Sequence, residues 1–497
     1  MFNFGAKPNP KIAVVPPKIR VEKAPPAKKP QPLPSKIASK TVQRPQVPTR
    51  TSPAKSRSAT ATPDRLEPRK RKAVRQKSPV QQRIESDSDD DDVDSPASFD
   101  EPIKRHKSDR PPDLNRKLRS EKAFSEEDGV VFPMIHAADI ASTSRKSKLV
   151  TAVEEKNVTV ELRYPSASQR ERYDLVFGKE QIDPAQEICD VAEIVTSIYL
   201  TEEEALPFTD PNSGIIRKLV RAKNLLSRDS RNKELLNGFK DAVDVYNKAL
   251  EVPLKNGSLA KNLDSMHYLP YDMVRLILRQ VYDRVVSPQV DTLKNKKENK
   301  ENTYGELLPP FVSKIFEETH LKSDQVFVDL GSGVGNVVLQ AALEIGCEGW
   351  GCEMMPNACD LADAQEKEFA ARCRLWGIRT GDVRLVRGDF MQNTAIHEAM
   401  RRADVILVNN EVFGSMLNRD LIHLFLDVKD GCKVVHLQPF VGSDDKMKSR
   451  TLNDPVNLFD RIEKQYFENW VSWKFESGNY YISTKNDRRL KEFEHLG

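Results

Sequence analysis

The stretch QVFVDLGSGVGNVVLQ at residues 325–340 constrains the fold more than any other part of the chain. An apolar strand reaches Asp329, three glycines follow at every second position (Gly331, Gly333 and Gly335), and an apolar helical segment comes next. A strand that passes through a glycine-rich turn into a helix is typical of the ligand-binding unit of a doubly wound α/β sheet. The stretch therefore predicts such a sheet, with a ligand at the carboxyl end of this strand.

Further short apolar segments follow at 348–354, 383–390, 404–410 and 432–438, joined by connections of helical character. Near-continuous apolar strands alternating with helices indicate a parallel sheet that is covered on both faces. Near the C-terminus the pattern changes, because the segments 471–475 and 479–484 flank the tight turn ESG. We interpret these two segments as an antiparallel hairpin at the sheet edge, which makes seven strands in total.

The spacing of the glycines separates this turn from turns that hold phosphates. A P-loop requires a Lys after its last glycine, and no Lys follows Gly335. The dinucleotide turn has the spacing GxGxxG, whereas this chain has GxGxG followed by Asn336. Asp329 would also repel a pyrophosphate. The turn is therefore predicted to bind a ligand that has a cationic group and no phosphate.

Acidic residues at two later strand ends indicate what else the ligand carries. Glu353 ends the second strand, where its carboxylate is placed to accept both hydroxyls of a ribose. Asp389 and Phe390 end the third strand, where they are placed to accept from an adenine amine and to stack on its ring. Adenine, ribose, an ammonium and a sulfonium together describe S-adenosylmethionine. Taken singly, Glu353 is equally a surface acid and Asp389 equally a helix N-cap, but together they favour a class I methyltransferase fold.

The residues after the fourth strand bear on the methyl acceptor. The sequence VNNEVF at 408–413 lacks the [DN]PPY motif of enzymes that methylate base amines, and Glu411 alone does not supply the acidic pair that holds an arginine. Asn409 offers a neutral amide to an amine. The aromatic side chains of Trp473 and Tyr480 suit the walls of a lysine channel, although they are equally interpreted as core residues of the sheet.

The remainder of the chain divides into a tail and a helical module. Residues 1–85 contain 21 Lys and Arg against 4 Asp and Glu, together with 15 of the 32 prolines. Such a composition buries too little apolar surface to offset the entropy of folding. We predict a disordered tail at 1–145, a mostly helical part at 146–300, a methyltransferase domain at 301–485 and a C-terminal tail at 486–497. Within the second part, 148–165 predicts one or two strands, and helical periodicity covers 187–200, two segments after residue 212, and 270–286.

The basic tail predicts a polyanionic partner, chiefly nucleic acid, with a solvated spacer as the alternative. Its clusters at 68–77 and 104–107 are candidate nuclear import signals. The acidic run at 86–96 either competes with DNA for the basic segment, with phosphorylation deepening its charge, or is simply solvated. Six cysteines form no CxxC pair or His/Cys cluster, so neither zinc nor a disulfide framework is predicted. No secretion signal and no membrane span is expected.

Several segments together resemble the Dot-one (disruptor of telomeric silencing) family of histone lysine methyltransferases. They are YGE at 304–306, VDLGSGVGNVVLQ at 328–340, the acidic strand end at Glu353, RGDF at 387–390, VNN at 408–410 and VSW…YY at 471–481. The resemblance spans about 150–485, and the segment 164–177 and the basic tail before a C-terminal catalytic domain are similar to the fungal branch. The family implies a nuclear enzyme without a SET domain that modifies a lysine on the disc face of histone H3 in intact nucleosomes. Roles in telomeric silencing and dependence on histone-linked ubiquitin are further family expectations.

The matched positions imply roles for individual residues. Tyr304 and Glu306 would lie in a loop that closes over the methionine part of the cofactor. Its amino-acid end would be lined by Asp329, Gly331 and Gly333, with Asn336 standing where animal members have Gln. Glu353 would hold the ribose, and Asp389 and Phe390 the adenine. The methyl-transfer site and the lysine channel would be shaped by Asn409, Phe413, Trp473 and Tyr480.

One departure from the family concerns Glu411, because animal members read NNFAF where this chain reads NNEVF. Glu411 either faces solvent or attracts the incoming lysine. The predicted reaction is a direct displacement, in which the neutral ε-amine attacks the sulfonium methyl carbon in line, with no metal and no covalent intermediate. The enzyme contributes positioning and desolvation, which also lowers the lysine pKa. The alternatives are a class I methyltransferase acting on RNA or a non-histone protein, and a non-catalytic chromatin scaffold.

Overall fold

The computed structural model describes residues 112–125, 130–143, 158–166, 169–176, 182–293, 305–440 and 458–488. All of these residues belong to the compact unit Val80–Gly497. Several features of the sequence lie outside the described residues: the basic clusters 68–77 and 104–107, the acidic run 86–96, the Lys-rich linker 294–300 and Tyr304.

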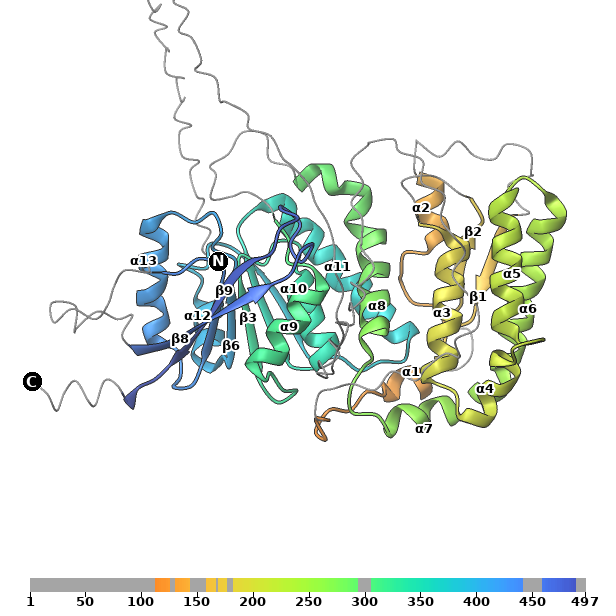
Figure 1. The fold of residues 1–497 in the computed structure, drawn as a ribbon, viewed down its shortest axis with the longest axis horizontal. Coiled ribbons are helices and arrows are strands. Elements are labelled where there is room, and N and C mark those ends of the chain that lie inside the picture. Colours follow the sequence, from red (N-terminus) through yellow and green to blue (C-terminus); the bar gives the residue numbers. More distant parts are fainter. Residues whose placement is uncertain are drawn as a thin grey trace, which may run out of the picture. The chain divides into compact units, whose positions relative to one another are not determined.

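A seven-stranded sheet carries the glycine turn (Figure 1). Its strand order is β5-β4-β3-β6-β7-β9-β8, and the neighbours from β5 to β7 pair in parallel, whereas β9 is antiparallel to both of its neighbours. The strands are β3 (Val326–Leu330), β4 (Glu348–Glu353), β5 (Val383–Arg387), β6 (Val405–Val408), β7 (Lys433–His436), β8 (Phe459–Tyr466) and β9 (Gly478–Lys485). The order reverses between β3 and β6, as in doubly wound sheets. The predicted class I methyltransferase fold is confirmed.

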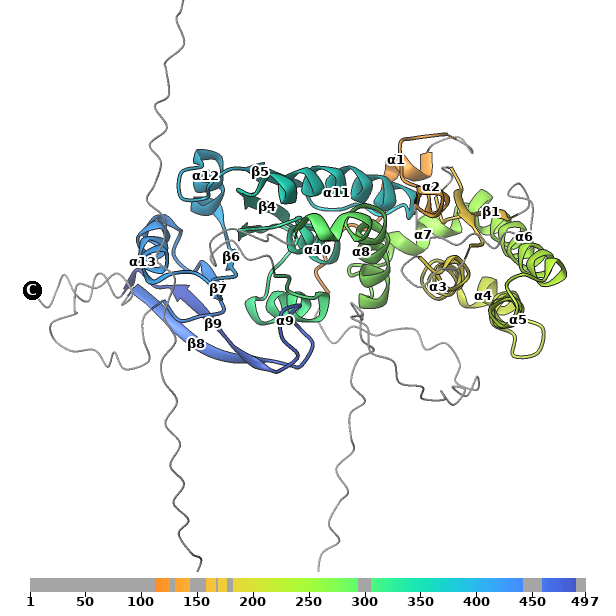
Figure 2. The same ribbon diagram turned by 90° about the horizontal axis from the view of Figure 1, so that it is seen from above.

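Helices cover both faces of the sheet because its central strands are apolar on both faces. Phe327 and Leu407 pack in one cluster with residues of α9 (Pro309–Thr319) and α10 (Asn336–Gln340). Val328 and Ile406 pack on the other face with residues of α12 (Thr394–Arg402) and α13 (Ser415–Leu424). Figure 2 shows α9 and α13 on opposite sides of the sheet. The carboxyl ends of the strands therefore meet at one edge between two helical layers.

The predicted position of the terminal hairpin is wrong for its first strand. The antiparallel pair consists of β8 and β9, and the segment 471–475 lies in the connection between them, where Val471 forms an isolated bridge with Leu307. β8 escaped the sequence pattern because it is an edge strand with the polar sequence FDRIEKQY and mostly exposed or half-buried side chains. Val471 and Trp473 are apolar for another reason: they pack on the chain that enters α9.

A helical module precedes the sheet, as predicted (Figure 1). Its helices are α3 (Pro184–Ile198), α4 (Glu202–Thr209), α5 (Ile215–Arg228), α6 (Lys233–Lys255), α7 (Ser258–Asp264) and α8 (Tyr271–Val285). The short antiparallel pair β1 (Thr159–Leu162) and β2 (Glu171–Asp174) completes the module. Among the strands predicted at 148–165, β1 is confirmed and 148–157 lies outside the described residues.

Residues 112–125 and 130–143, which were assigned to the tail, contribute to the folded core. They include α1 (Glu121–Ser125) and α2 (Ala137–Thr143), and Leu118 and Ala123 are buried. Their partners are distant in sequence: Arg379 N donates to Leu118 O at 2.7 Å, and Arg116 Nη2 donates to Leu343 O at 3.1 Å. The amino-acid composition of this segment alone gives no indication of contacts with such distant residues.

The helical module and the sheet domain share one core rather than meeting at a boundary near residue 300. The long helix α11 (Pro356–Leu375), which follows β4, packs along α8. Trp376, at the end of α11, donates from Nε1 to Gln280 Oε1 at 2.9 Å and accepts from Tyr199 Oη at its carbonyl at 2.7 Å. Its ring lies 5.0 Å from that of Tyr164 in an edge-to-face arrangement. The position of α11 is therefore fixed by residues of the module.

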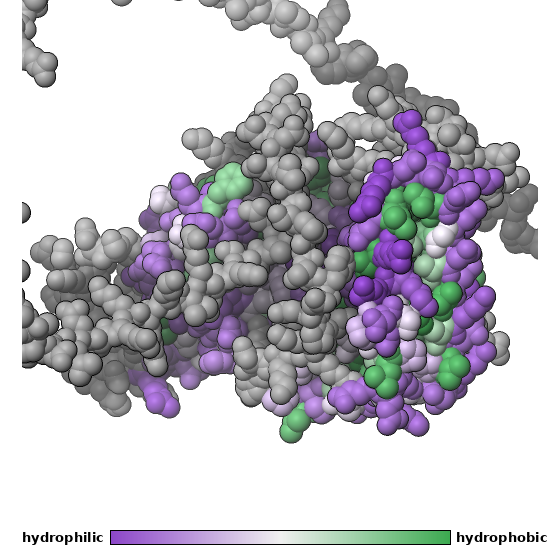
Figure 3. Space-filling view, turned by 45° about the vertical axis from the view of Figure 1, so that its right-hand side comes forward, coloured by the Kyte–Doolittle hydropathy of each residue, from purple (hydrophilic) through white to green (hydrophobic). Residues whose placement is uncertain are grey.

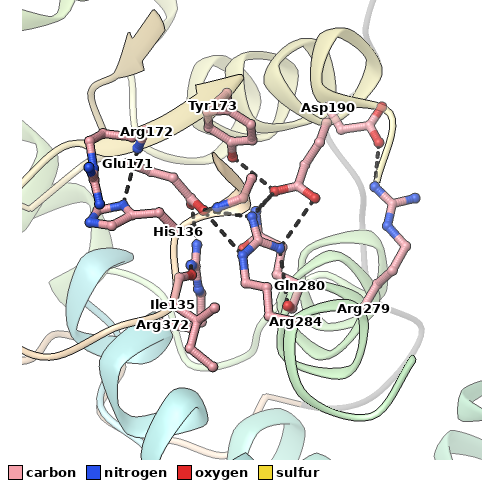
Figure 4. A network of polar contacts seen from close by, with 12 residues as sticks. Ile135, His136, Glu171, Arg172, Tyr173, Asp190, Arg279, Gln280, Arg284 and Arg372 are labelled. Atoms are coloured by element: carbon pink, nitrogen blue, oxygen red, sulfur yellow. Dashed lines mark hydrogen bonds and ion pairs between the residues drawn. The ribbon is translucent and has the colours of Figure 1, made fainter. Parts of the chain in front are cut away.

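A buried polar network strengthens this junction (Figure 4). It joins three carboxylates to two guanidinium groups, from Glu171, Glu187, Glu368, Arg284 and Arg372, and all of these side chains are 0–3% exposed. Arg284 Nη2 lies 2.6 Å from an oxygen of Glu171 and 2.6 Å from one of Glu187, and Arg372 binds Glu171 and, at 2.7 Å, Glu368. Buried charges are tolerated when they are paired in this way.

No described helix is long and apolar enough to cross a membrane. All six cysteines are buried free thiols. Burial raises the pKa of each of them, including that of Cys352 to about 12, so none is a ready thiolate near neutral pH.

Candidate functional site

The glycine turn brings backbone amides to the end of β3. Gly331 and Gly335 have φ values of 83° and 89°, in the left-handed region that glycine adopts without strain. A Cβ at Gly335 would also lie 2.8 Å from Leu385 Cδ1. Gly331 N donates to Cys352 O at 2.9 Å, which holds the turn against β4. At Gly331 and Gly335 the turn therefore presents its backbone without a side chain.

Asp329 is the buried acid of the site. Its residue is 4% exposed, and burial, followed by the charge of Glu353, raises its pKa to about 8. A carboxyl group in this state is stabilised as an anion when a cationic group binds beside it. The predicted preference for a cationic ligand therefore agrees with the electrostatics of the unliganded protein.

Glu353 is anchored to the glycine turn rather than exposed as a free surface acid. Its Oε2 accepts from Gly333 N at 2.9 Å, and its Oε1 accepts from Met354 N at 2.8 Å and from Met355 N at 2.7 Å. A carboxylate has about four acceptor positions, so capacity remains for ligand hydroxyls. The side chain is half-buried and lies at the strand end at which a ribose was expected.

Asp389 and Phe390 follow β5 at the same edge. Asp389 is not the N-cap of α12, which is Asn393, but its Oδ1 accepts from Met391 N at 2.9 Å and so shapes the turn. Phe390 is buried and stacks on Phe413, with ring centroids 6.3 Å apart and planes 26° apart. Phe390, which was expected to contact the adenine, therefore packs against Phe413, which was expected on the acceptor side.

Asn409 and Trp473 meet around Gly305. Asn409 Nδ2 donates to Gly305 O at 3.4 Å, and a Cβ at Gly305 would lie 2.7 Å from Trp473 Cε3. Asn409 Oδ1 and Trp473 Nε1 are buried and have no hydrogen-bond partner within the described part of the chain. Buried polar atoms without partners are costly, so one on each of these two neighbours of Gly305 indicates a site for a polar ligand.

The segment that contains Gly305 is held from two sides. Glu306 N donates to Ser472 Oγ at 2.8 Å, and Ser472 N donates to Glu306 O at 2.9 Å. Glu306 Oε1 accepts from Asn336 Nδ2 at 3.1 Å, and Asn336 Oδ1 accepts from Gln365 Nε2 at 3.0 Å. The expected loop residue Glu306 is thereby connected to the glycine turn. Gln365 was not predicted, because nothing in the sequence of α11 distinguishes it from other polar residues of that helix.

Two expected residues behave differently. Tyr480 is 1% exposed and packs on Phe311, with ring centroids 5.1 Å apart, which agrees with the core interpretation. Glu411 accepts from Gln438 Nε2 at 2.8 Å and lies 4.0 Å from Lys474 Nζ. Its charge is therefore partly neutralised by neighbouring side chains.

A cavity of about 940 Å³ lies elsewhere, between α3, α4, α7 and α8, where Glu193, Met266 and Arg279 are among the lining residues. None of the residues assigned to the strand-end site lines it. The strand-end site is therefore defined by its side chains and turn geometry, and this cavity is separate from it.

Comparison with solved structures gives distant likenesses. An RNA methyltransferase from Salinibacter ruber in complex with S-adenosyl-L-homocysteine is 19% identical and covers 36% of this chain and 92% of that chain, with a TM-score of 0.25. A likeness at this level carries no argument about the function of this chain.

Sequence comparisons are far closer. The family model of the histone methylation protein DOT1 matches residues 282–485. Three relatives are each named histone-lysine N-methyltransferase, H3 lysine-79 specific. The relative from Gibberella zeae is 50% identical over 429 residues, which cover 85% of each chain. The relative from Emericella nidulans is 49% identical over 386 residues, which cover 77% of this chain and 75% of the relative. The relative from Aspergillus fumigatus is 46% identical over 446 residues, which cover 88% of this chain and 87% of the relative. With half of its residues identical over most of both chains, the chain belongs to the DOT1 family of histone-lysine N-methyltransferases.

Proposed function

We propose that the chain methylates lysine-79 of histone H3 within intact nucleosomes, with S-adenosylmethionine as the methyl donor, and that it acts in the nucleus on chromatin and telomeric silencing. The observation that carries the proposal is buried Asp329, whose raised pKa makes it a receptor for a cationic group, next to Glu353 on the glycine turn. The names of the relatives supply the acceptor.

The residues at the strand ends fit S-adenosylmethionine. Asp329 would hold its ammonium, Glu353 its ribose hydroxyls, and Phe390 its adenine ring, while Gly331 and Gly333 leave room for close approach. When bound, S-adenosylmethionine supplies a methyl group that is already activated for displacement by an amine. Neither a metal nor a covalent enzyme intermediate is required for this chemistry.

The acceptor side is built from Asn409, Gly305 and Trp473. The unpartnered Asn409 Oδ1 is placed to accept from an entering group, and the Trp473 ring forms an apolar wall for a lysine stem. This wall excludes water, which favours the neutral form of the lysine amine. The chain thus contributes positioning and desolvation rather than a dedicated base.

Methyl transfer tests the proposal directly. Full-length protein and radiolabelled S-adenosylmethionine are incubated in parallel with nucleosomes, free histones and RNA. Label is expected on histone H3 of nucleosomes, at a position lost when lysine-79 of H3 is replaced by Arg. Label on RNA would establish the alternative enzyme, and no label on any acceptor, with donor binding intact, would establish a scaffold.

The basic tail is proposed to hold nucleosomal DNA. Residues 1–110 hold 25 Lys and Arg against 13 Asp and Glu, a net charge of +12, so deleting them is expected to weaken nucleosome binding and to flatten its dependence on salt. Affinities measured at several salt concentrations check this, with free histone H3 as a substrate that carries no DNA. Equal salt slopes for the two proteins would show that the tail is only a spacer.

Ubiquitin linked to another histone is a further proposed partner. Comparing methylation of ubiquitin-modified and unmodified nucleosomes tests this.

A further inference from the structure

The helical module carries a strongly basic surface on α5 and the turn after it. Residues 215–233 contain seven Lys and Arg and a single acid, Asp229. Six of the seven are exposed: Arg217, Lys218, Arg221, Arg228, Arg231 and Lys233. Figure 1 shows α5 at the outer side of the module, away from the seven-stranded sheet, and Figure 3 shows this side as largely hydrophilic with isolated apolar residues. This surface is separate from the strand-end site.

Three arginines form a straight row on α5. Leu219 and Leu226 are fully buried against the module, which fixes the rotation of the helix. With 3.6 residues per turn, Arg217, Arg221 and Arg228 lie within about 40° of one another and roughly opposite the buried leucines, and the row is about 16 Å long. The packing that buries one face of α5 therefore presents the three guanidinium groups together.

The two acids that flank α5 in the sequence, Asp210 and Asp229, are occupied by local turns. Asp210 Oδ1 accepts from Asn212 N at 3.0 Å and from Ser213 Oγ at 2.8 Å, and Asp229 Oδ1 accepts from Arg231 N at 3.2 Å. Within the described segments, no ion pair involves any of the three arginines of the row. Arg217 donates from Nη1 to Pro211 O at 2.7 Å, which orients its guanidinium and leaves other donors available.

The chemistry of the row points to a phosphate backbone. Arginine matches phosphate oxygens with paired donors, and duplex DNA presents one negative charge for about every 1.7 Å of its axis. Proteins that bind single strands add aromatic side chains on which bases stack, and α5 contains no aromatic residue. We propose that Arg217, Arg221 and Arg228 bind the phosphate backbone of duplex DNA, as a contact distinct from that of the basic tail.

Salt-dependent binding of a free DNA duplex of arbitrary sequence tests this proposal without using methyl transfer. The full-length variant Arg217→Gln/Arg221→Gln/Arg228→Gln is compared with the unchanged protein at several salt concentrations by fluorescence anisotropy. Loss of three phosphate contacts is expected to reduce the slope of log K against log salt by about 3 and to weaken binding equally for all sequences. Unchanged binding of S-adenosylmethionine would show that the variant is folded.

A charge-matched control is Lys261→Gln/Lys322→Gln/Lys367→Gln, which removes three exposed lysines that lie off the row. Its slope is expected to stay within about 1 of the unchanged protein. Equal slopes for the two triple variants would overturn the proposal, because the effect would then be one of net charge alone. An arginine variant with unchanged duplex binding, or one that lost only single-stranded DNA, would overturn it as well.

Discussion

Replacing Asp329 by Asn is expected to weaken binding of S-adenosylmethionine by about 2–5 kcal/mol, which corresponds to roughly 30- to 5000-fold in Kd. Asn has nearly the same shape, but it provides no negative charge for the ammonium that Asp329 is proposed to bind. Titration calorimetry with the full-length protein measures the change. The matched control is Asp324→Asn, an exposed acid just before β3, which is expected to leave the Kd unchanged.

The same substitution is expected to remove a pH dependence. The pKa of Asp329 in the unliganded protein is about 8, so near pH 7 most molecules carry a proton that must leave when a cationic group binds. Affinity of the unchanged protein therefore rises with pH up to about 8, by at most tenfold per pH unit. The Asp329→Asn variant lacks this proton, so the ratio of the two affinities grows over the same range. A constant ratio from pH 6 to pH 8.5 would disprove the role of Asp329.

Stability of the unliganded protein should change in the opposite direction. The folded-state pKa of Asp329 lies above its ordinary value of 3.8, so between about pH 4 and pH 8 the folded protein holds a proton that the unfolded chain has lost. The contribution of Asp329 to stability therefore falls as pH rises through this window. Asp329→Asn avoids that loss, and it is expected to exceed the unchanged protein in stability at pH 8 but not at pH 4. Urea unfolding at both pH values measures the difference.

The sequence predicted the parts of the fold whose signal is local. Each of the five parallel strands lies within one of the short segments from which it was predicted, and helical connections follow the first four. β8 did not have this signal, because an edge strand with one solvated face does not need apolar residues. The fold of residues 112–125 depends on partners more than 200 residues away, such as Leu343 and Arg379, and no local pattern encodes these.

The residues of the site divide in the same way, into those predicted from a sequence pattern and those whose role depends on packing between distant segments. Asp329, Glu353 and Asn409 were predicted because strand ends in a doubly wound sheet converge regardless of their separation in the chain. Tyr480 was assigned to the channel by its position in a matched motif, but the direction of its side chain depends on β-strand register. In the structure that register turns Tyr480 toward Phe311 in the core. Gln365 was missed because its partner, Asn336, is identified only once α11 is packed beside the glycine turn.

α11 connects the site to the buried network of the module. Gln365 binds the glycine turn through Val334 O at 2.7 Å, and Glu368 and Arg372, one and two turns further along the same helix, belong to the network. Because the module and the sheet share one core, the module sets the position of α11, and α11 in turn holds the glycine turn in place. Gln365→Ala is expected to weaken donor binding and to lower the free energy of unfolding by about 1–3 kcal/mol, because Gln365 is buried and its loss leaves Val334 O and Asn336 Oδ1 without this donor.

Replacing Arg284 by Met is expected to lower the free energy of unfolding by about 3–5 kcal/mol. Arg284 is fully buried between Glu171 and Glu187, and its loss would leave three buried carboxylates with one guanidinium. Met fills a similar volume, so the cost comes from unpaired charge and not from a cavity. Urea unfolding followed by tryptophan fluorescence measures it, since Trp376 binds the same network through Gln280.

Arg119→Met supplies the matched control, because Arg119 pairs with Asp264 at 2.8 Å but the two side chains are 33% and 51% exposed. Loss of this exposed pair is expected to lower the free energy of unfolding by at most about 1 kcal/mol.

The destabilisation caused by Arg284→Met should also depend on pH. Burial would raise the pKa of Glu171, but the charges of Arg284 and Arg372 outweigh it and lower the pKa to about 2, from an ordinary value of 4.5. The stability that this pairing contributes is therefore complete above about pH 4.5 and is lost as pH falls toward 2. A destabilisation equal to that of Arg119→Met, or one that grows between pH 4.5 and pH 3, would show that the network does not stabilise the junction through its charges.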